Sequence, residues 1–174
     1  LENDGVAAAI GEWRFGAGRG LRAFVYVTVS TGIGGGVIAD GHVLRGRRRL
    51  AAHLGHMTIL PQGEVCLCGN RGCWEAQASG TALGDLARKL AADTPGSALF
   101  RHGPSVNARH VMEAARAGDE LGLRLVAKEA ELLAVNTKRR DTIAQVGDDA
   151  RRIRGDFDRR SLTKRAESDR KREE

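Results

Sequence analysis

Four residues with metal-binding side chains lie close together in the sequence. His56 is separated by nine residues from the motif CLCGNRGC at positions 66–73, which holds the only three cysteines of the chain. Thiolates and a neutral imidazole are the ligands that zinc prefers, and four of them close a tetrahedron without an open position. We therefore expect a structural zinc ion on His56, Cys66, Cys68 and Cys73. The alternative is a set of unconnected buried thiols.

A second candidate site is the glycine-rich run STGIGGG at positions 30–36. Backbone N–H groups without side chains in front of them form a concave row of donors that suits phosphate oxygens, and Thr31 adds a hydroxyl. The run is not a Walker loop, because no Gly-Lys-Ser/Thr follows, and it does not match a G-x-G-x-x-G that opens a helix. Phosphate binding and an ordinary glycine hairpin turn are both compatible with this pattern.

Asn3 and Asp4 form a third candidate, because they stand at the start of a predicted helix. Either side chain could cap the first helical turn. The functional alternative is a carboxylate that acts as a general base in a cleft, with an amide beside it that holds a hydroxyl.

Four helices are predicted to position these residues. Residues 4–14 are alanine-rich with Trp13 on the apolar face and Asp4 as the cap. Further helices are expected at 79–92, at 107–117 and, capped by Asp119, at 119–136. Their inward residues would be Leu83, Leu86 and Leu90 in the first, Val111, Met112 and Ala115 in the second, and Leu125, Val126, Ala130 and Leu133 in the third.

The strand pattern is clearest at residues 21–30, which are rich in β-branched and aromatic residues. The glycines at 32–36 are predicted to form a hairpin turn, after which residues 37–39 resume an apolar run. Asp40-Gly41 supplies a second turn. A short strand is expected at residues 57–60, where Pro61 would stop it.

Composition narrows the class of protein. The chain has 174 residues, is 41% hydrophobic and carries a formal net charge of +6, so it is long enough for one domain with a sizeable core. Residues 138–174 hold 13 Lys/Arg and 9 Asp/Glu, which we interpret as a solvated helix or a disordered tail. We expect neither a nucleic-acid partner nor a membrane span. Cysteines in a metal pattern without a leader sequence favour a cytoplasmic protein.

Five motifs follow one another along the chain: Asn-Asp and its helix, the TGIGGG turn, Gly55-His56, the cysteine motif followed by Glu75, and Ala-Ser-Gly at 78–80. In this order they resemble the ROK family of repressors and sugar kinases, especially its bacterial glucokinases. The resemblance runs from about residue 1 to residue 136. It implies an actin-like, ribonuclease H-type α/β fold of two lobes with a sugar and ATP between them. Residues 1–20 would end the N-terminal lobe, 21–137 would form most of the larger lobe, and 138–174 would be the charged tail.

The resemblance also implies roles for single residues. Asp4 would remove the proton of the sugar 6-hydroxyl, and Asn3 would bind a ring hydroxyl. Glu75 would accept from a hydroxyl near the anomeric end, while His56 would both ligate zinc and face the sugar. The phosphates of ATP, bridged by Mg²⁺, would lie against the residues of the turn, which are Thr31, Gly32, Gly34, Gly35 and Gly36.

This chain departs from the family pattern in four places. His53 stands where the family usually has a sugar-binding glutamate, in Ala52-His53-Leu54-Gly55-His56 rather than Gly-Glu-x-Gly-His. Val6 replaces an asparagine. Neither the N-terminal Asp-x-Gly-x-Thr strand nor the apolar strand and glycine turn expected after Asn136 is found, so we expect an incomplete chain with little or no activity by itself.

The resemblance implies a glucokinase-like enzyme of carbohydrate metabolism and glycolysis that transfers a phosphoryl group from ATP to the 6-hydroxyl of glucose or a related hexose. The intact protein would form a homo-oligomer. Retention of Asp4 and of the complete turn favours the kinase over a sugar-responsive transcriptional regulator of the same family, which needs neither. A non-catalytic zinc-binding remnant is the third alternative.

Overall fold

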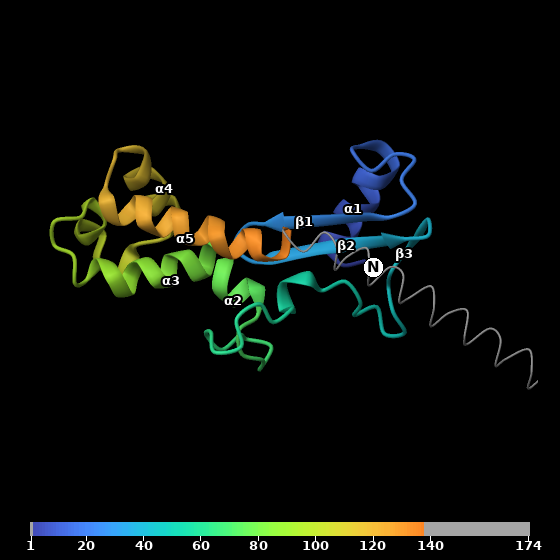
Figure 1. Cartoon of the computed structure of the whole chain (residues 1–174), viewed down its shortest axis with the longest axis horizontal. Coiled ribbons are helices and arrows are strands. Elements are labelled where there is room, and N and C mark those ends of the chain that lie inside the picture. Colours follow the sequence, from blue (N-terminus) through green and yellow to red (C-terminus); the bar gives the residue numbers. More distant parts are fainter. Residues whose placement is uncertain (1, 138–174) are drawn as a thin grey trace, which may run out of the picture. The chain divides into compact units, whose positions relative to one another are not determined.

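A computed structural model describes residues 2–137, which belong to a compact unit bounded by Leu1–Thr137 (Figure 1). The tail expected at 138–174 lies outside the described residues. A small antiparallel sheet carries α1 (Asp4–Phe15), and α3 (Gly80–Ala91), α4 (Ala108–Arg116) and α5 (Glu120–Thr137) pack together beyond the end of this sheet. None of the helices within the described range is long and apolar enough to cross a membrane.

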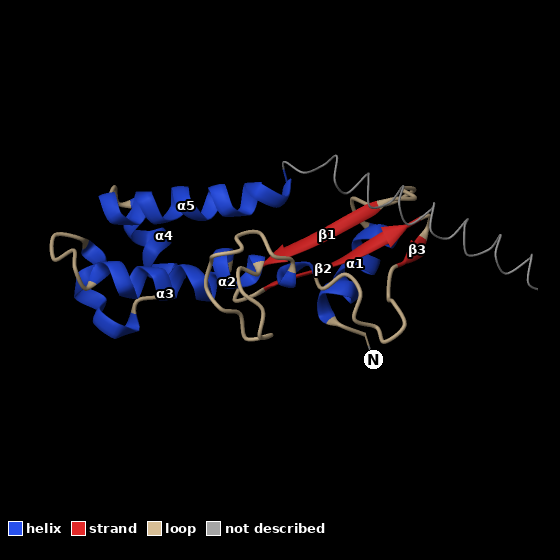
Figure 2. Cartoon of the chain, turned by 60° about the horizontal axis from the view of Figure 1, so that its bottom comes forward, coloured by secondary structure: helices blue, strands red, loops and turns tan. Residues whose placement is uncertain are grey.

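The sheet contains β1 (Phe24–Val29), β2 (Ile33–Ala39) and β3 (His42–Val43) in that order, and each neighbouring pair is antiparallel (Figure 2). The predicted glycine turn is wrong in extent, because glycines 34–36 lie within β2 opposite residues 26–28 of β1. The reversal itself is confined to residues 30–32, where the Ser30 N–H donates to the Gly32 carbonyl over 2.9 Å. The second turn is confirmed, since Asp40 and Gly41 have φ angles of 52° and 74°.

Helix α1 crosses the sheet at close range. A Cβ atom on Gly36 would lie 2.5 Å from the Ala9 Cβ and 3.1 Å from the Val6 Cα, so only glycine lets the helix approach β2 this closely. The predicted cap is wrong by one residue: Asn3 is the N-cap and accepts from the N–H groups of Gly5 and Val6. Asp4 therefore occupies the first helical position.

The main apolar core lies among α3, α4 and α5 and the 3₁₀ segment η2 (Ala98–Ser105). Three residues predicted to face inward are exposed instead: Leu90 at 38%, Met112 at 39%, and Ala130. Small residues fill the helix contacts instead, because alanine allows close approach of the backbones. The buried residues of this core are Leu83, Ala87, Ala91, Leu99, Val106, Val111, Ala114, Leu121 and Leu125.

One capping residue joins two of these elements. Asp119 accepts from the Gly122 N–H at 2.9 Å, as expected for the N-cap of α5, and also from the Ser97 hydroxyl and the Ala98 N–H. Burial acts against ionisation of Asp119, but these hydrogen bonds prevail and lower the pKa of its carboxyl group.

The segment between the sheet and α3 contains two short helical elements, η1 (Leu54–His56) and α2 (Trp74–Ala78). The strand predicted at 57–60 is absent from this part of the structure, where only a single bridge joins Thr58 to Cys73. Trp74 is buried and donates through Nε1 to the Leu132 carbonyl at 3.1 Å, so it ties α2 to α5.

Candidate active site and metal centre

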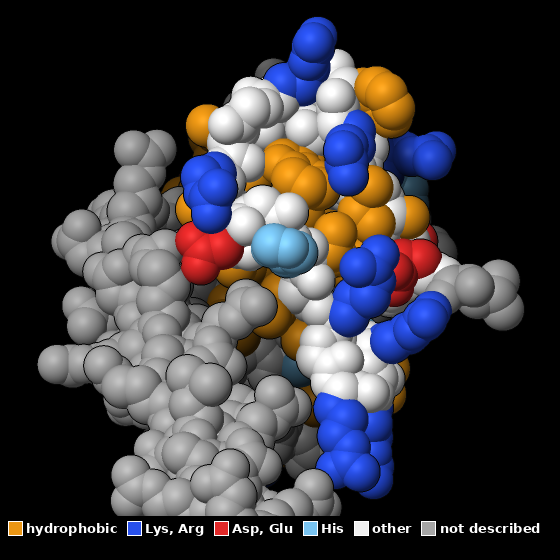
Figure 3. Space-filling model, turned by 90° about the vertical axis from the view of Figure 1, so that its right-hand side faces the viewer, with side chains coloured by type: hydrophobic (Ala, Val, Ile, Leu, Met, Phe, Trp, Pro, Cys, Tyr) orange, Lys and Arg blue, Asp and Glu red, His pale blue; other side chains and the backbone are white. Residues whose placement is uncertain are grey.

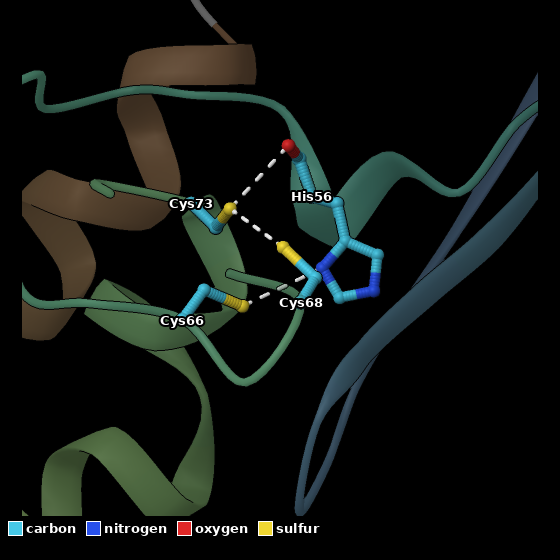
Figure 4. Close-up of side chains that lie close together, drawn as sticks. All are labelled: His56, Cys66, Cys68 and Cys73. Atoms are coloured by element: carbon cyan, nitrogen blue, oxygen red, sulfur yellow. Dashed lines mark hydrogen bonds between the residues drawn. The ribbon is translucent and has the colours of Figure 1, made fainter. Parts of the chain in front are cut away.

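The four predicted zinc ligands converge in the structure (Figure 4). Their donor atoms all lie within 4.8 Å of one another. The Cys68 and Cys73 Sγ atoms are 3.6 Å apart, and the Cys66 Sγ lies 3.6 Å from the His56 Nδ1. A zinc ion with Zn–S bonds of about 2.3 Å would place two tetrahedral sulfur ligands about 3.8 Å apart. The donor set and its spacing therefore fit a tetrahedral metal.

The electrostatic setting differs between the cysteines. Burial raises the pKa of the Cys73 thiol to about 12, and hydrogen bonds with Cys68 and Cys66 act in the same direction. By contrast, a hydrogen bond from the Asn70 backbone lowers the pKa of Cys68. A cation in the centre would stabilise all three thiolates and so offset the cost of ionising Cys73.

The backbone around these ligands folds tightly on itself. The Cys66 N–H donates to the Asn70 carbonyl at 2.7 Å, and the Gly69 N–H donates back to the Cys66 carbonyl at 2.9 Å. Gly72 has a φ of 75°, and a Cβ there would lie 1.7 Å from the Leu60 carbonyl oxygen. Glycine at this position is thus required for the chain to return to Cys73.

Next to the metal centre lies a polar cavity of about 640 Å³. It brings together most of the residues that the sequence singled out from widely separated segments. The residues around it are Asn3, Asp4, Thr28, Ser30, Thr31, Gly32, Ile33, Gly34, Gly35, His53, His56 and Glu75. Gly36 is not among them, and its contacts with α1 give it a packing role.

Hydrogen bonds from two sides hold the turn that lines this cavity. The Glu75 Oε2 accepts from the Ile33 N–H at 2.8 Å. From the other side, the Thr81 hydroxyl donates to the Thr31 carbonyl at 2.9 Å, and the Gly80 N–H donates to the Ser30 carbonyl at 2.8 Å. Glu75 therefore positions the turn as well as facing the cavity. Sequence reasoning missed Thr81, whose only signal was its place directly after Ala-Ser-Gly.

The two histidines of the cavity come from either end of η1. The ring centroids of His53 and His56 are 6.3 Å apart, and the His56 Nδ1 faces the metal centre (Figure 4). His53 therefore occupies the cavity wall at the position where the sequence departs from the family pattern.

A second cavity, of about 810 Å³, adjoins the first. Ser30 and Thr31 line both cavities. Beyond them the second cavity extends between the end of β1 and helices α3, α4 and α5. The start of the turn at residues 30–32 thus borders both cavities.

Comparison with known proteins gives consistent results. The ROK family profile matches residues 1–143. The chain is 42% identical over 137 residues to a glucokinase of Thermotoga maritima, a match that covers 77% of this chain and 43% of that protein. It is also 49% identical over 83 residues to the xylose repressor of Bacillus subtilis, covering 48% of this chain and 22% of the repressor.

Solved structures with the same fold include a ROK hexokinase from Thermus thermophilus, with a TM-score of 0.68 and 43% identity over 81% of this chain and 46% of that one. A ROK family glucokinase from Streptomyces griseus, solved in complex with glucose and AMPPNP, gives a TM-score of 0.66 and 40% identity over 76% and 44% of the two chains. The chain spans less than half the length of these relatives. The predicted actin-like α/β fold is confirmed, and the chain belongs to the ROK family.

Proposed function

We propose that the chain contributes the sugar and phosphate sites of an ATP-dependent hexose kinase, with glucose as the hexose. The observation that carries this proposal is the shared cavity, in which Asp4, the glycine-rich turn and Glu75 meet although they come from α1, the β1–β2 connection and α2. The likeness to a glucokinase solved with glucose and AMPPNP supports it. The free cysteines suit a reducing compartment such as the cytoplasm.

Asp4 is proposed as the general base. As the sugar 6-oxygen attacks the γ-phosphorus, its proton passes to the Asp4 carboxylate and the bond to the bridging oxygen of ADP breaks. A positioned base of this kind contributes about 10²–10⁴-fold to a rate. The Asn3 side chain already caps α1 through its oxygen, which leaves its amide N–H₂ to bind a ring hydroxyl.

The sugar would be held at its other end by His56 and Glu75. One Glu75 oxygen is engaged by the Ile33 N–H, so the other is the acceptor offered to a hydroxyl. Zinc on the adjacent cysteines would fix both ends of the segment that carries these contacts, and the sugar site would be formed before the ligand arrives.

The nucleotide is proposed to lie across residues 30–35, which are the turn and the start of β2. Because the Ile33 N–H already donates to Glu75, the Gly32 N–H and the Thr31 hydroxyl would bind phosphate oxygens, and a bound Mg²⁺ would offset charge on the transferring group. Because Ser30 and Thr31 also line the second cavity, the nucleoside would extend into it.

Asp4→Asn tests the catalytic role. A chimera in which the matched 137-residue segment of the Thermotoga maritima glucokinase is replaced by the corresponding segment of this chain should phosphorylate glucose, and Asp4→Asn should lower kcat by at least about a hundredfold with little change in glucose affinity. Glu12→Gln, at the far end of the same helix, is the matched control. An active chimera that is unaffected by Asp4→Asn would refute the assignment of the base.

A sugar-responsive regulator is the second candidate, favoured by the likeness to the xylose repressor. It predicts sugar binding without turnover. Glucose binding by a chimera whose phosphoryl transfer stays at background for several hexoses would favour the regulator over the kinase.

A further inference from the structure

The second cavity contains an acidic residue that the proposed mechanism does not use. Its wall is mainly apolar, and Glu129 enters it from α5. No hydrogen bond or ion pair to the Glu129 carboxylate is found within residues 2–137 of the structure. The apolar residues around the cavity are Val29, Leu83, Ala108, Met112, Val126, Ala130 and Leu133.

Two other charged residues line the cavity, Arg88 from α3 and Arg109 from α4. Arg88 donates to the Val106 carbonyl at 2.6 Å and pairs with Asp85, so its guanidinium is already engaged. The β1 end and its turn contribute no titratable group to the cavity, and α2 contributes no residue to it. Burial raises the pKa of Glu129 to about 7, because few polar groups stabilise its charge.

A half-buried carboxylate that has no protein donor is stabilised when a ligand supplies one. The cavity volume of about 810 Å³ lies within the range of small-molecule sites, which are typically apolar with a few polar groups. Its apolar wall suits the faces of a base, and its link to Thr31 places it beyond the phosphate turn. The ligand donors available on a nucleoside are its ribose hydroxyls and an exocyclic amine.

We propose that Glu129 is a specificity-determining residue that accepts a hydrogen bond from the nucleoside part of the bound nucleotide, either from a ribose hydroxyl or from the amine of adenine. The inference rests on the proposed kinase function, since it requires a nucleotide in the second cavity. It assigns to α5 a direct role in selecting the phosphoryl donor.

Calorimetry on the full 174-residue chain tests the inference with ATP and with adenosine, which has no phosphate charge. Glu129→Gln should weaken adenosine binding about tenfold at pH 8, the loss typical of a hydrogen bond to a charged group. The difference should largely vanish at pH 6, where the wild-type carboxyl is mostly protonated. Glu131→Gln, an exposed acid two residues along α5, should bind like wild type at both pH values.

Nucleoside analogues locate the donor. The effect of Glu129→Gln should disappear with 2′-deoxyadenosine or 3′-deoxyadenosine if a ribose hydroxyl is the donor, and with inosine if it is the amine. An effect that persists with all three analogues would overturn the assignment, as would equal adenosine affinity of wild type and Glu129→Gln at pH 8. If wild type binds ATP but Glu129→Gln changes nothing, only this inference is lost. If wild type binds neither ATP nor adenosine, the nucleotide site of the proposed kinase is lost with it.

Discussion

Two irregular loops border the proposed sugar cavity, and they are held in different ways. The cysteine loop (residues 57–73) supplies three of the four candidate metal ligands, and His56 directly precedes it. The arginine loop (residues 44–53) follows β3 and ends at His53. Both loops lack regular secondary structure. The arginine loop ends at His53 and the cysteine loop lies between His56 and Glu75, and these three residues line the same cavity.

The cysteine loop buries little apolar surface. Most of its large hydrophobic side chains are exposed, with Leu67 at 105% and Val65 at 60%, and only Cys66 and Cys73 among its apolar residues are buried. Ile59 is partly buried against a small apolar cluster, so hydrophobic burial contributes little to holding the loop. Its backbone hydrogen bonds and the four converging metal donors are what remains to fix it.

The arginine loop is held by backbone turns. The Ala51 N–H donates to the Arg45 carbonyl at 3.1 Å, while Arg49 and Ala52 adopt φ angles of 58° and 64°, a region that disfavours residues with a Cβ. Arg45 pairs with Glu2 at 2.7 Å, and the Arg45 guanidinium lowers the pKa of that carboxyl. Lys and Arg side chains gather around apolar atoms on the face at this end of the sheet (Figure 3).

The comparison shows that one cavity wall is flanked by four converging metal donors, whereas the other contains residues with a Cβ in the left-handed region. Loss of the metal should release the wall that carries His56 and Glu75. Relief of strain should stiffen the wall that carries His53. Four substitutions or treatments separate these effects.

Removal of the metal should have the largest effect. Cys73→Ser or chelation is expected to lower the free energy of unfolding by more than about 3 kcal/mol, since metal binding contributes directly to folding. Metal analysis should find one zinc per chain in wild type and none in Cys73→Ser, and thermal unfolding reports the stability. A metal-free wild-type protein with the same melting temperature would contradict the zinc assignment.

His53→Glu should have the next largest effect, on sugar affinity. A carboxylate in this wall would accept a charge-assisted hydrogen bond from a sugar hydroxyl, worth about 1.5–3 kcal/mol or roughly ten- to a hundredfold in affinity. Glucose calorimetry measures the gain. Arg48→Glu places a carboxylate in the same loop but outside the cavity and should give no gain. Equal affinities for His53→Glu and wild type would place residue 53 away from the sugar.

Ala52→Gly should relieve strain in the arginine loop. A left-handed residue with a Cβ costs about 1–2 kcal/mol, and the greater freedom of glycine in the unfolded chain offsets about half of that. We expect a net stabilisation of about 0.5 kcal/mol in denaturant unfolding. Ala51→Gly is the matched control, because Ala51 is not among the positive-φ residues; it should destabilise, and the same sign for both would argue against strain at Ala52.

The smallest effect is expected for Arg47→Gln and Arg48→Gln. No hydrogen bond or ion pair of either side chain is found among the described residues, and exposed side chains of this kind contribute within about 0.5 kcal/mol. Melting temperatures should match wild type within error. A clear loss of stability would show that the arginine loop depends on its charges.

Much of the site could be predicted from residue types at short spacing. The metal ligands lie within 18 positions of one another, so their chemistry and the glycines between them define the site locally. The turn at Asp40-Gly41 and the cap at Asp119 were predictable for the same reason, since each depends on a few adjacent residues. The cap of α1 was predicted one residue too late, at Asp4 instead of Asn3, because both side-chain types favour the N-cap.

Other features depended on contacts between distant segments. Glycines 34–36 have the composition of a turn, but pairing with β1 and close packing of α1 make them a strand. The Glu75–Ile33 hydrogen bond spans 42 positions, and no local pattern marks it.

In the sequence, Glu129 has the pattern of an ordinary acidic residue on a helix. Only its position beside α3, α4 and the end of β1 partly buries it. Short-range steric preferences and the spacing of candidate metal ligands can therefore be predicted from the sequence. Close approach and desolvation depend on which surfaces meet, and they are decided only when the chain has folded.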